Sequence, residues 1–212
     1  MIDTRRKILD AAERLFGEQG YGATSLRHII AEAGVNLAAI HYHFGTKEEL
    51  LDQLIMRKGG PVNAERLALL DALEAEACGK AVPVEKLLEA FLGPPMMRVA
   101  KNPEFARLMG RMYGEGLMPG IVERHFQTVV KRSSAALALA LPDLTPGELA
   151  LRLQFMTGAM AHILMGKAPG AKTMTGAAQP MGSRHVLRSL VAFLSGGLRA
   201  PAARKGRRRI HK

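Results

Sequence analysis

The sequence contains one cysteine, Cys78, and no tryptophan, and aromatic side chains make up only 5% of its 212 residues. A single cysteine can form neither a disulfide within the chain nor a cysteine-based zinc cluster, which favours a reducing compartment. Long apolar runs are also absent: Arg152 and His162 interrupt the most apolar stretch, residues 149–166, which falls short of the roughly 20 apolar residues of a membrane-spanning helix. Charged side chains over residues 3–13 argue against a secretory signal. We therefore expect a cytoplasmic chain without a membrane span.

What is present is enough apolar material for a core, together with an uneven distribution of charge. Apolar side chains make up 48% of the residues and charged ones 23%, and the formal net charge is +11. Residues 1–58 are neutral, residues 59–198 carry +4 and residues 199–212 carry +7. The last segment sets its cations among Ala, Gly and Pro, so we expect a basic flexible tail that suits a polyanion. A merely solubilising tail is an equal alternative.

Apolar residues recur at spacings of three and four and almost no segment alternates with period two, so we predict an all-α fold without strands. In the N-terminal region we expect helices over about 4–18, 25–33 and 35–44, and another that starts at the capping box Thr46–Glu49. The sequence Gly59-Gly60-Pro61 predicts a break in the chain. We place a domain boundary there, which gives a small N-terminal domain over 1–58, a larger helical domain over 59–198 and the tail over 199–212.

Further helices are expected in the larger domain, with clear start signals at two of them. Asn102 precedes Pro103, and Thr145 precedes Pro146, each a cap followed by proline at the first helical position. Residues 166–182, rich in Gly, Ala, Thr and Pro, predict a mobile loop. The predicted helices lie near 62–77, 84–92, 103–113, 118–141, 146–165 and 184–198.

A helix, a tight turn at Gly34 and a short second helix form the pattern of a helix-turn-helix over about residues 25–44. In such a motif the first helix braces the second, which lies in the major groove of DNA. Ile40 and Phe44, four residues apart, should face the core and leave small residues, tyrosine and histidine for the groove. The pattern alone is weak evidence, since Tyr42 and Phe44 could both be ordinary core aromatics.

The flanking sequence strengthens this interpretation. The segments GYGATS at 20–25, AGV at 33–35 and above all YHFGTKEEL at 42–50 resemble the DNA-binding domain of TetR/AcrR-family transcriptional regulators, over about residues 4–55. The resemblance implies a homodimer whose two helix-turn-helix units bind a palindromic operator in double-stranded DNA. It also implies a C-terminal helical domain that binds a small effector and dimerises. We interpret the chain as such a regulator, nucleoid-associated and acting as a repressor.

Carried over position by position, the resemblance implies the DNA contacts. The Tyr42 hydroxyl should contact one phosphate, and Thr46 and Lys47, at a helix N-terminus, another. Base readout falls to Arg27 of the bracing helix and to Leu37, Ala38, Ala39, His41 and His43 of the short helix, with Ser25 and Asn36 completing the set. Many family members carry Lys or Ser followed by Gly where this chain has Leu37 and Ala38, so the operator sequence is not predicted. His41 and His43 point to different faces of a helix, and we expect no metal.

The C-terminal half is rich in phenylalanine and methionine, which line adaptable apolar pockets, although most such residues simply pack a core. For His162, a satisfied core or interface histidine is the main alternative to a ligand contact. The segment at residues 60–67 resembles a subgroup with members that respond to long-chain fatty acids, so a small hydrophobic or amphipathic, acyl-type effector is our hypothesis. The predicted pocket residues are Phe91, Met97, Arg98, Phe105, Met109, Met112, Tyr113, His125, Phe126, Phe155 and His162.

The last two predicted helices, 146–165 and 184–198, carry small and apolar faces that could form a four-helix interface between two subunits, as the family resemblance also implies. An enzyme is not indicated. The sequence GKAPGAKT at 166–173 superficially resembles a phosphate-binding loop, but Ala171 stands where glycine is required. We expect no catalytic residues and no cofactor. The rival hypotheses are a nonspecific nucleic-acid binder driven by the tail and a small helical protein that processes a ligand.

Overall fold

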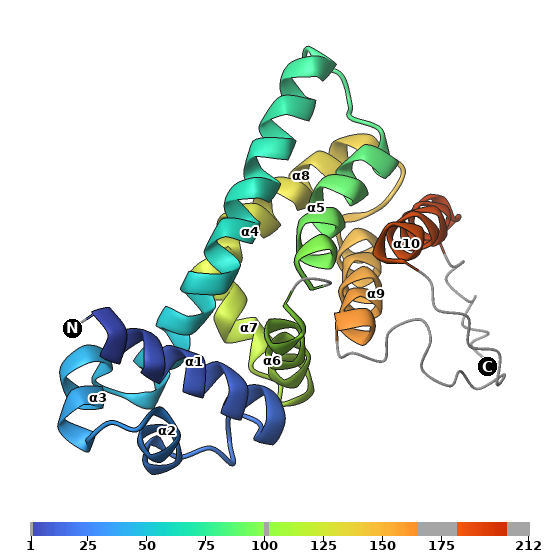
Figure 1. Ribbon diagram of the computed structural model, residues 1–212. Coiled ribbons are helices and arrows are strands. Elements are labelled where there is room, and N and C mark those ends of the chain that lie inside the picture. Colours follow the sequence, from blue (N-terminus) through green and yellow to red (C-terminus); the bar gives the residue numbers. More distant parts are fainter. Residues whose placement is uncertain (1, 100–101, 165–181, 203–212) are drawn as a thin grey trace, which may run out of the picture.

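The computed structural model describes residues 2–99, 102–164 and 182–202 (Figure 1). Over these ranges the chain is helical and contains no strand, which confirms the all-α prediction. The elements are α1 (Ile2–Gln19), α2 (Leu26–Ala33), α3 (Leu37–Phe44), α4 (Lys47–Ala77), α5 (Val84–Val99), α6 (Pro103–Gly114), α7 (Met118–Ile121), the π-helical turn η1 (Val122–Phe126), α8 (Gln127–Ala140), α9 (Pro146–Leu164) and α10 (Ser183–Arg199). None of these helices has the length and apolarity that crossing a membrane requires.

Helices α1 to α3 and the start of α4 form the N-terminal unit, whose apolar side chains meet in one core. Ile8 and Phe16 of α1 and Ile40 of α3 are almost fully buried in it. The same core continues into α6, where Leu108 and Met112 are equally buried, and α6 packs along α1. A second core lies at the other end, between α5, α8, α9 and α10. The N-terminal unit therefore rests on α6 as well as on α4.

The predicted break at Gly59-Gly60-Pro61 is wrong, because α4 runs without interruption from Lys47 to Ala77. A proline usually clashes with the Cβ of the residue before it in a helix, but Gly60 has no Cβ. Gly59 serves packing: a Cβ there would lie 2.9 Å from Cζ of Phe126, so its absence allows η1 to approach α4. The boundary that we predicted after residue 58 thus falls inside a helix, and the division into domains stays a prediction.

Other differences are smaller. The helix predicted over 84–92 continues to Val99, through two prolines, and the single helix predicted over 118–141 is divided into α7, η1 and α8. The predicted loop 166–182 lies outside the described residues except for Gly182, and of the tail only 199–202 are described. Arg199, which we counted with the tail, ends α10 and pairs with Glu85 of α5, lowering the pKa of that carboxyl to about 2.

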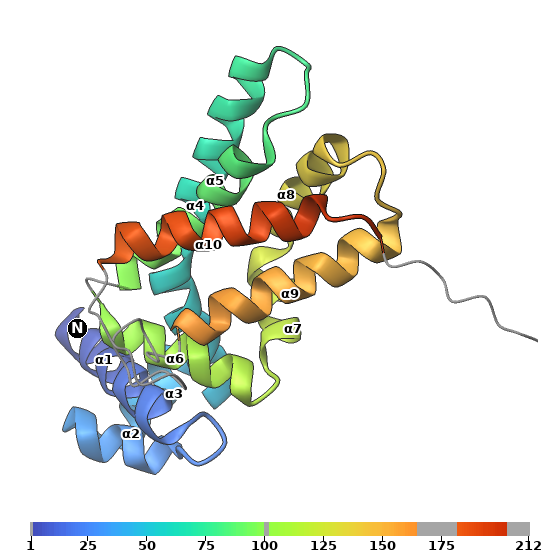
Figure 2. The same cartoon turned by 90° about the vertical axis from the view of Figure 1, so that its right-hand side faces the viewer.

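The two views show how the elements place the functional regions. Helix α4 rises from the N-terminal unit to the opposite end of the molecule, alongside α5 and α8 (Figure 1). Helices α9 and α10 cross the face that is turned to the viewer in Figure 2 and contact each other there. The helix-turn-helix thus lies at one end, and a broad helical face lies on one side.

Candidate nucleic-acid interface and interior pocket

The N-termini of α2 and α3 are each capped by the residue that directly precedes the helix. The Ser25 hydroxyl accepts the amide of His28 at 3.2 Å, and the Asn36 side chain accepts the amide of Ala39 at 2.9 Å. Between the helices, Gly34 adopts a left-handed conformation with φ of 64°, which costs a residue without Cβ little. These contacts fix the angle between α2 and α3, as a helix-turn-helix requires.

Helix α3 has one buried and one exposed side, as predicted. Ile40 and Phe44 are 1% and 3% exposed, whereas the Tyr42 side chain is 79% exposed and carries its hydroxyl on the surface. Leu37 is 44% exposed, and apolar exposure at this position suits contact with a thymine methyl group. Of the other predicted DNA contacts, Ser25, Arg27, Asn36, Ala38, His41 and Thr46 are exposed, and Ala39, His43 and Lys47 are half-buried.

The start of α4 is the predicted phosphate clamp, and it is already hydrogen-bonded within the chain. The Thr46 hydroxyl accepts the Glu49 amide at 3.1 Å, and the Glu49 carboxylate accepts the Thr46 amide at 2.8 Å. The Lys47 ammonium donates to the carbonyl of Tyr21 at 2.5 Å and lies 4.1 Å from the centre of the Tyr21 ring. Burial lowers the pKa of Lys47. A phosphate contact would require this side chain to leave the Tyr21 carbonyl.

His41 also closes the end of α3. Its Nδ1 lies 3.1 Å from the carbonyl oxygen of Gly45, so this nitrogen must carry the proton that it donates. In the neutral ring, Nε2 is then an acceptor on the exposed side of the helix. The side chain can therefore offer DNA an acceptor when neutral and a second donor when protonated.

Several polar contacts connect the N-terminal unit to the rest of the molecule, among them the hydrogen bond that Arg111 of α6 donates to the Glu18 carbonyl at 2.8 Å. The Glu115 carboxylate, after α6, accepts the amides of Tyr21 and Gly22, both at 3.1 Å. Asp52 of α4 accepts from Arg124 and lies 2.8 Å from Nε2 of His125 in η1. Burial alone would raise the pKa of Asp52, but these hydrogen bonds outweigh it and lower the pKa. These hydrogen bonds connect the end of α6 to the turn before α2, and η1 to α4.

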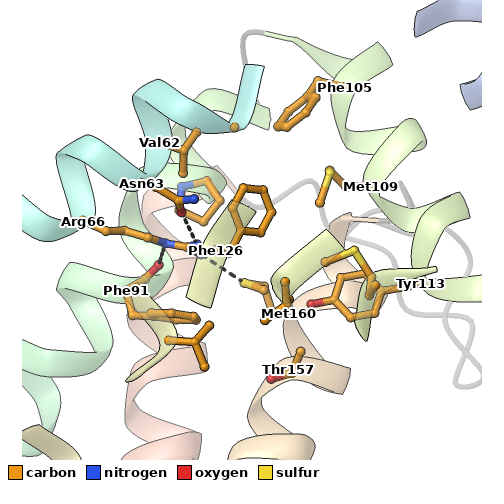
Figure 3. Close-up of a pocket in the computed structure, with 15 residues that line it drawn as sticks. Val62, Asn63, Arg66, Phe91, Phe105, Met109, Tyr113, Phe126, Thr157 and Met160 are labelled. Atoms are coloured by element: carbon orange, nitrogen blue, oxygen red, sulfur yellow. Dashed lines mark hydrogen bonds between the residues drawn. The ribbon is translucent and has the colours of Figure 1, made fainter. Parts of the chain in front are cut away.

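A cavity of about 200 Å³ lies in the interior between α4, α5, α6, η1 and α9 (Figure 3). Phenylalanine and methionine dominate its wall, and Arg66 is the charged side chain that reaches it. The full lining is Gly59, Val62, Asn63, Arg66, Phe91, Pro95, Phe105, Met109, Tyr113, Met118, Val122, Phe126, Val130, Thr157 and Met160. Concave, mostly apolar sites with a few polar groups are typical of small-molecule binding.

The structure brings five of the predicted pocket residues to this wall, namely Phe91, Phe105, Met109, Tyr113 and Phe126. The other six lie elsewhere. Met112 is fully buried in the core beside the cavity, and Met97 packs against the second core. Phe155 and His162 are exposed, so a satisfied core position for His162 is not observed in this chain. Arg98 pairs with Glu65, and His125 contacts Asp52.

Sequence reasoning missed Arg66, the buried cation of the cavity. Its Nε donates to the Phe91 carbonyl at 2.7 Å, and its guanidinium lies 4.1 Å from the centre of the Phe91 ring (Figure 3). Met160, which also lines the cavity, was not among the predicted pocket residues. From sequence alone, an arginine in a helix is expected to lie on the surface. The burial of Arg66 follows only from the packing of α4 against α5. Within the described ranges no three His, Cys, Asp or Glu side chains gather as a metal site would require.

Comparison with known proteins agrees with both halves of this description. Residues 8–54 match the family described as bacterial regulatory proteins, tetR family. Residues 89–197, just over half of the chain, match the family described as the tetracyclin repressor-like C-terminal domain. The transcriptional regulator BetI of Rhizobium meliloti is 28% identical over 156 residues, which is 74% of this chain and 73% of BetI.

Two further similar proteins match different shares of this chain. The regulator AcrR of Shigella flexneri is 46% identical over 52 residues, so the match covers 24% of this chain and about a quarter of AcrR. The crystal structure of HlyIIR, a hemolysin II transcriptional regulator, aligns with a TM-score of 0.62 and 21% identity over 94% of this chain and 99% of HlyIIR. The first is a local sequence likeness, and the second shows the fold.

Both family matches confirm the resemblance to TetR/AcrR-family regulators that the sequence motifs indicated. The proteins of this family regulate transcription, bind DNA and act as dimers, and they are not enzymes, as we expected for this chain. The chain belongs to the TetR family of transcriptional regulators.

Proposed function

We propose that this regulator is a dimeric repressor that binds a palindromic operator and is released when a small apolar or amphipathic effector fills the interior cavity. The position of the cavity carries the proposal. Its wall includes α4, which begins directly after the recognition helix α3, and α6, on which the N-terminal unit rests. An occupant therefore touches both elements that hold the helix-turn-helix.

The proposed mechanism is thermodynamic linkage. Two recognition helices of a dimer fit half-sites one turn of DNA apart, about 34–36 Å. An effector that binds better to a conformation with another spacing weakens operator binding, and the operator weakens effector binding by the same factor. The hydrogen bonds of Glu115 to the turn before α2, and of Asp52 to η1, are the rigid connections that would convert a change in the cavity into a change of spacing.

The test of the DNA-binding half is selection of random duplexes on the purified chain at about 150 mM salt, where nonspecific binding is screened. We expect a palindromic consensus. Salt-sensitive binding without a consensus would instead support the nonspecific, tail-driven binder. The same selection on a chain truncated after Ala202 isolates the tail, since Arg199 and Ala200 belong to the folded part through Glu85 and Arg152.

Lys47→Ala tests the proposed phosphate clamp. We expect affinity to fall by a similar factor for all DNA sequences, and the slope of log affinity against log salt to decrease by about 1 per subunit bound. Lys131→Ala on α8, an exposed lysine outside the N-terminal unit, is the control. Because Lys47 also bonds to the Tyr21 carbonyl, thermal unfolding is measured in parallel. A sequence-selective loss with an unchanged salt slope would contradict the clamp.

A further inference from the structure

Arg66 is a buried cation that has no counterion among the described residues. Its side chain is 8% exposed, and the acceptors of its hydrogen bonds are all neutral. They are the Phe91 carbonyl at 2.7 Å, Oδ1 of Asn63 at 3.2 Å and Sδ of Met160 at 3.8 Å. Burial lowers the pKa of Arg66 to about 10, which leaves it charged at neutral pH. Burying an unpaired charge is costly, so its presence in an apolar cavity calls for an explanation.

Part of the explanation is local. In a helix the Phe91 carbonyl would accept the amide of residue 95, but Pro95 has no N–H. Nε of Arg66 supplies the missing donor from α4. This contact uses one of the five N–H groups and would be made equally well by a neutral donor. The hydrogen bond to the Phe91 carbonyl therefore explains neither the positive charge of Arg66 nor the other N–H groups of its guanidinium.

The wall of the cavity offers a second donor near Arg66. The Tyr113 side chain of α6 points its hydroxyl inward, toward Met160 (Figure 3), and no hydrogen bond of this hydroxyl is found in the described part of the chain. Burial raises the pKa of Tyr113, and the neighbouring Arg66 charge only partly offsets this, so the hydroxyl stays protonated. The rest of the wall is mainly hydrocarbon, aromatic ring and thioether.

We propose that the cavity is a binding site for a small apolar monocarboxylate, whose carboxylate pairs with Arg66 and accepts a hydrogen bond from Tyr113. Carboxylates match the planar donors of a guanidinium and form its strongest hydrogen bonds. The hydrocarbon body lies against Phe105, Met109 and Phe126. A volume of about 200 Å³ exceeds only modestly the roughly 150 Å³ of a cavity that holds benzene. It favours one aromatic ring or a medium acyl chain over a long chain.

Calorimetric titration tests the site directly with probes that differ only in the head group. The probes are octanoate beside 1-octanol and 3-phenylpropanoate beside 3-phenylpropanol. We expect the wild-type chain to bind at least one of the two acids about 10- to 100-fold more tightly than its alcohol, as charge-assisted hydrogen bonds imply. Equal affinities for each acid and its alcohol, or no binding of either acid, would overturn the proposal.

Three variants locate the preference. Arg66→Met replaces the guanidinium by a shorter, unbranched apolar side chain and should abolish the preference for the acid while the alcohol still binds. Tyr113→Phe removes only a hydroxyl, so this variant should fold even if Arg66→Met does not. It should weaken acid binding about 3- to 10-fold and leave alcohol binding unchanged. Arg132→Met makes the same exchange at a half-buried arginine of α8 that pairs with Asp71 and Glu74 of α4 and does not line the cavity, and should change neither affinity. A preference that survives both Arg66→Met and Tyr113→Phe would refute the assignment.

The regulatory consequence rests on the proposed function, and operator binding separates the two. If the acid binds through Arg66 but operator affinity is unchanged, the anion site stands and its role as effector site fails. If an alcohol releases the operator as well as its acid does, the effector-responsive function stands and the anion preference is wrong. Release by the acid alone, lost in Arg66→Met, supports both.

Discussion

The contribution of an ion pair to the stability of this fold depends on how deeply the pair is buried. Glu13 of α1 is 2% exposed, and Lys58 of α4 pairs with its Oε2 at 2.7 Å, while Oε1 has no hydrogen-bond partner among the described residues. One residue earlier, Arg57 pairs with Asp10 at 2.8 Å on the surface, where the side chains are 33% and 53% exposed. Removal of one partner from a buried pair leaves an uncompensated charge, whereas exposed pairs are nearly neutral.

Lys58→Met should therefore destabilise the fold much more than Arg57→Met, although both remove one cation from α4. We expect a loss of about 2–3 kcal/mol for Lys58→Met, below the roughly 3–5 kcal/mol of a fully buried pair because Lys58 is partly exposed, and under about 1 kcal/mol for Arg57→Met. Urea unfolding at neutral pH measures both. Equal losses would show that the Glu13 site is open to water.

At the scale of single elements, α4 shows what a local reading of sequence cannot decide. Considered from the local sequence only, glycine and proline predict the end of a helix, and Gly59-Gly60-Pro61 places three such residues in a row. The helix nevertheless continues, because Gly60 lacks the Cβ that would clash with the ring of Pro61 and Gly59 leaves room for the ring of Phe126. The resulting 31-residue helix connects the recognition motif to the cavity, so the missed continuity is the functionally important feature.

Pro61→Ala should stabilise the chain, since it restores the hydrogen bond to the Arg57 carbonyl that an interior proline lacks. We expect a gain of about 1–2 kcal/mol, or a few degrees in Tm, after allowance for the lost rigidity of the unfolded chain. Pro146→Ala is the matched control: that proline is the first residue of α9, where its amide would have no partner, and it should give no gain. A loss of stability in Pro61→Ala would mean that α4 needs its present shape at this point.

The DNA-binding elements, in contrast, could be predicted almost completely. The capping box at Thr46 and the burial of Ile40 and Phe44 were predicted from local pattern and helical periodicity. Ser25 and Asn36, predicted only as DNA contacts, also cap their helices by accepting amides three residues ahead. All of these signals lie within one or two turns of helix. The cavity could be predicted only in part, because its composition was visible but its geometry depends on contacts between residues far apart, such as Arg66 with Phe91 and Met160.

At the scale of the whole molecule, large apolar side chains of α9 and α10 remain uncovered. Phe155 is 62% exposed and Phe193 is 75% exposed, and Figure 2 shows the two helices crossing on one side. Exposed aromatic side chains on adjacent helices favour association with a second copy of the same face. We propose that these two helices from each subunit form a four-helix dimer interface. Dimerisation would then set the distance between the two recognition helices.

Phe193→Arg tests this interface. A charge within an apolar, self-complementary contact is repeated by symmetry, so we expect the dimer to dissociate at least 100-fold more readily. Sedimentation equilibrium measures the change, and binding to the palindromic duplex should fall while the helical content stays the same. Leu139→Arg on α8, where the side chain is 73% exposed, makes a comparable exchange outside this face and should leave the dimer intact. If only Leu139→Arg yields monomers, α8 rather than α10 holds the subunits together, and the spacing of the recognition helices must be derived from that face instead.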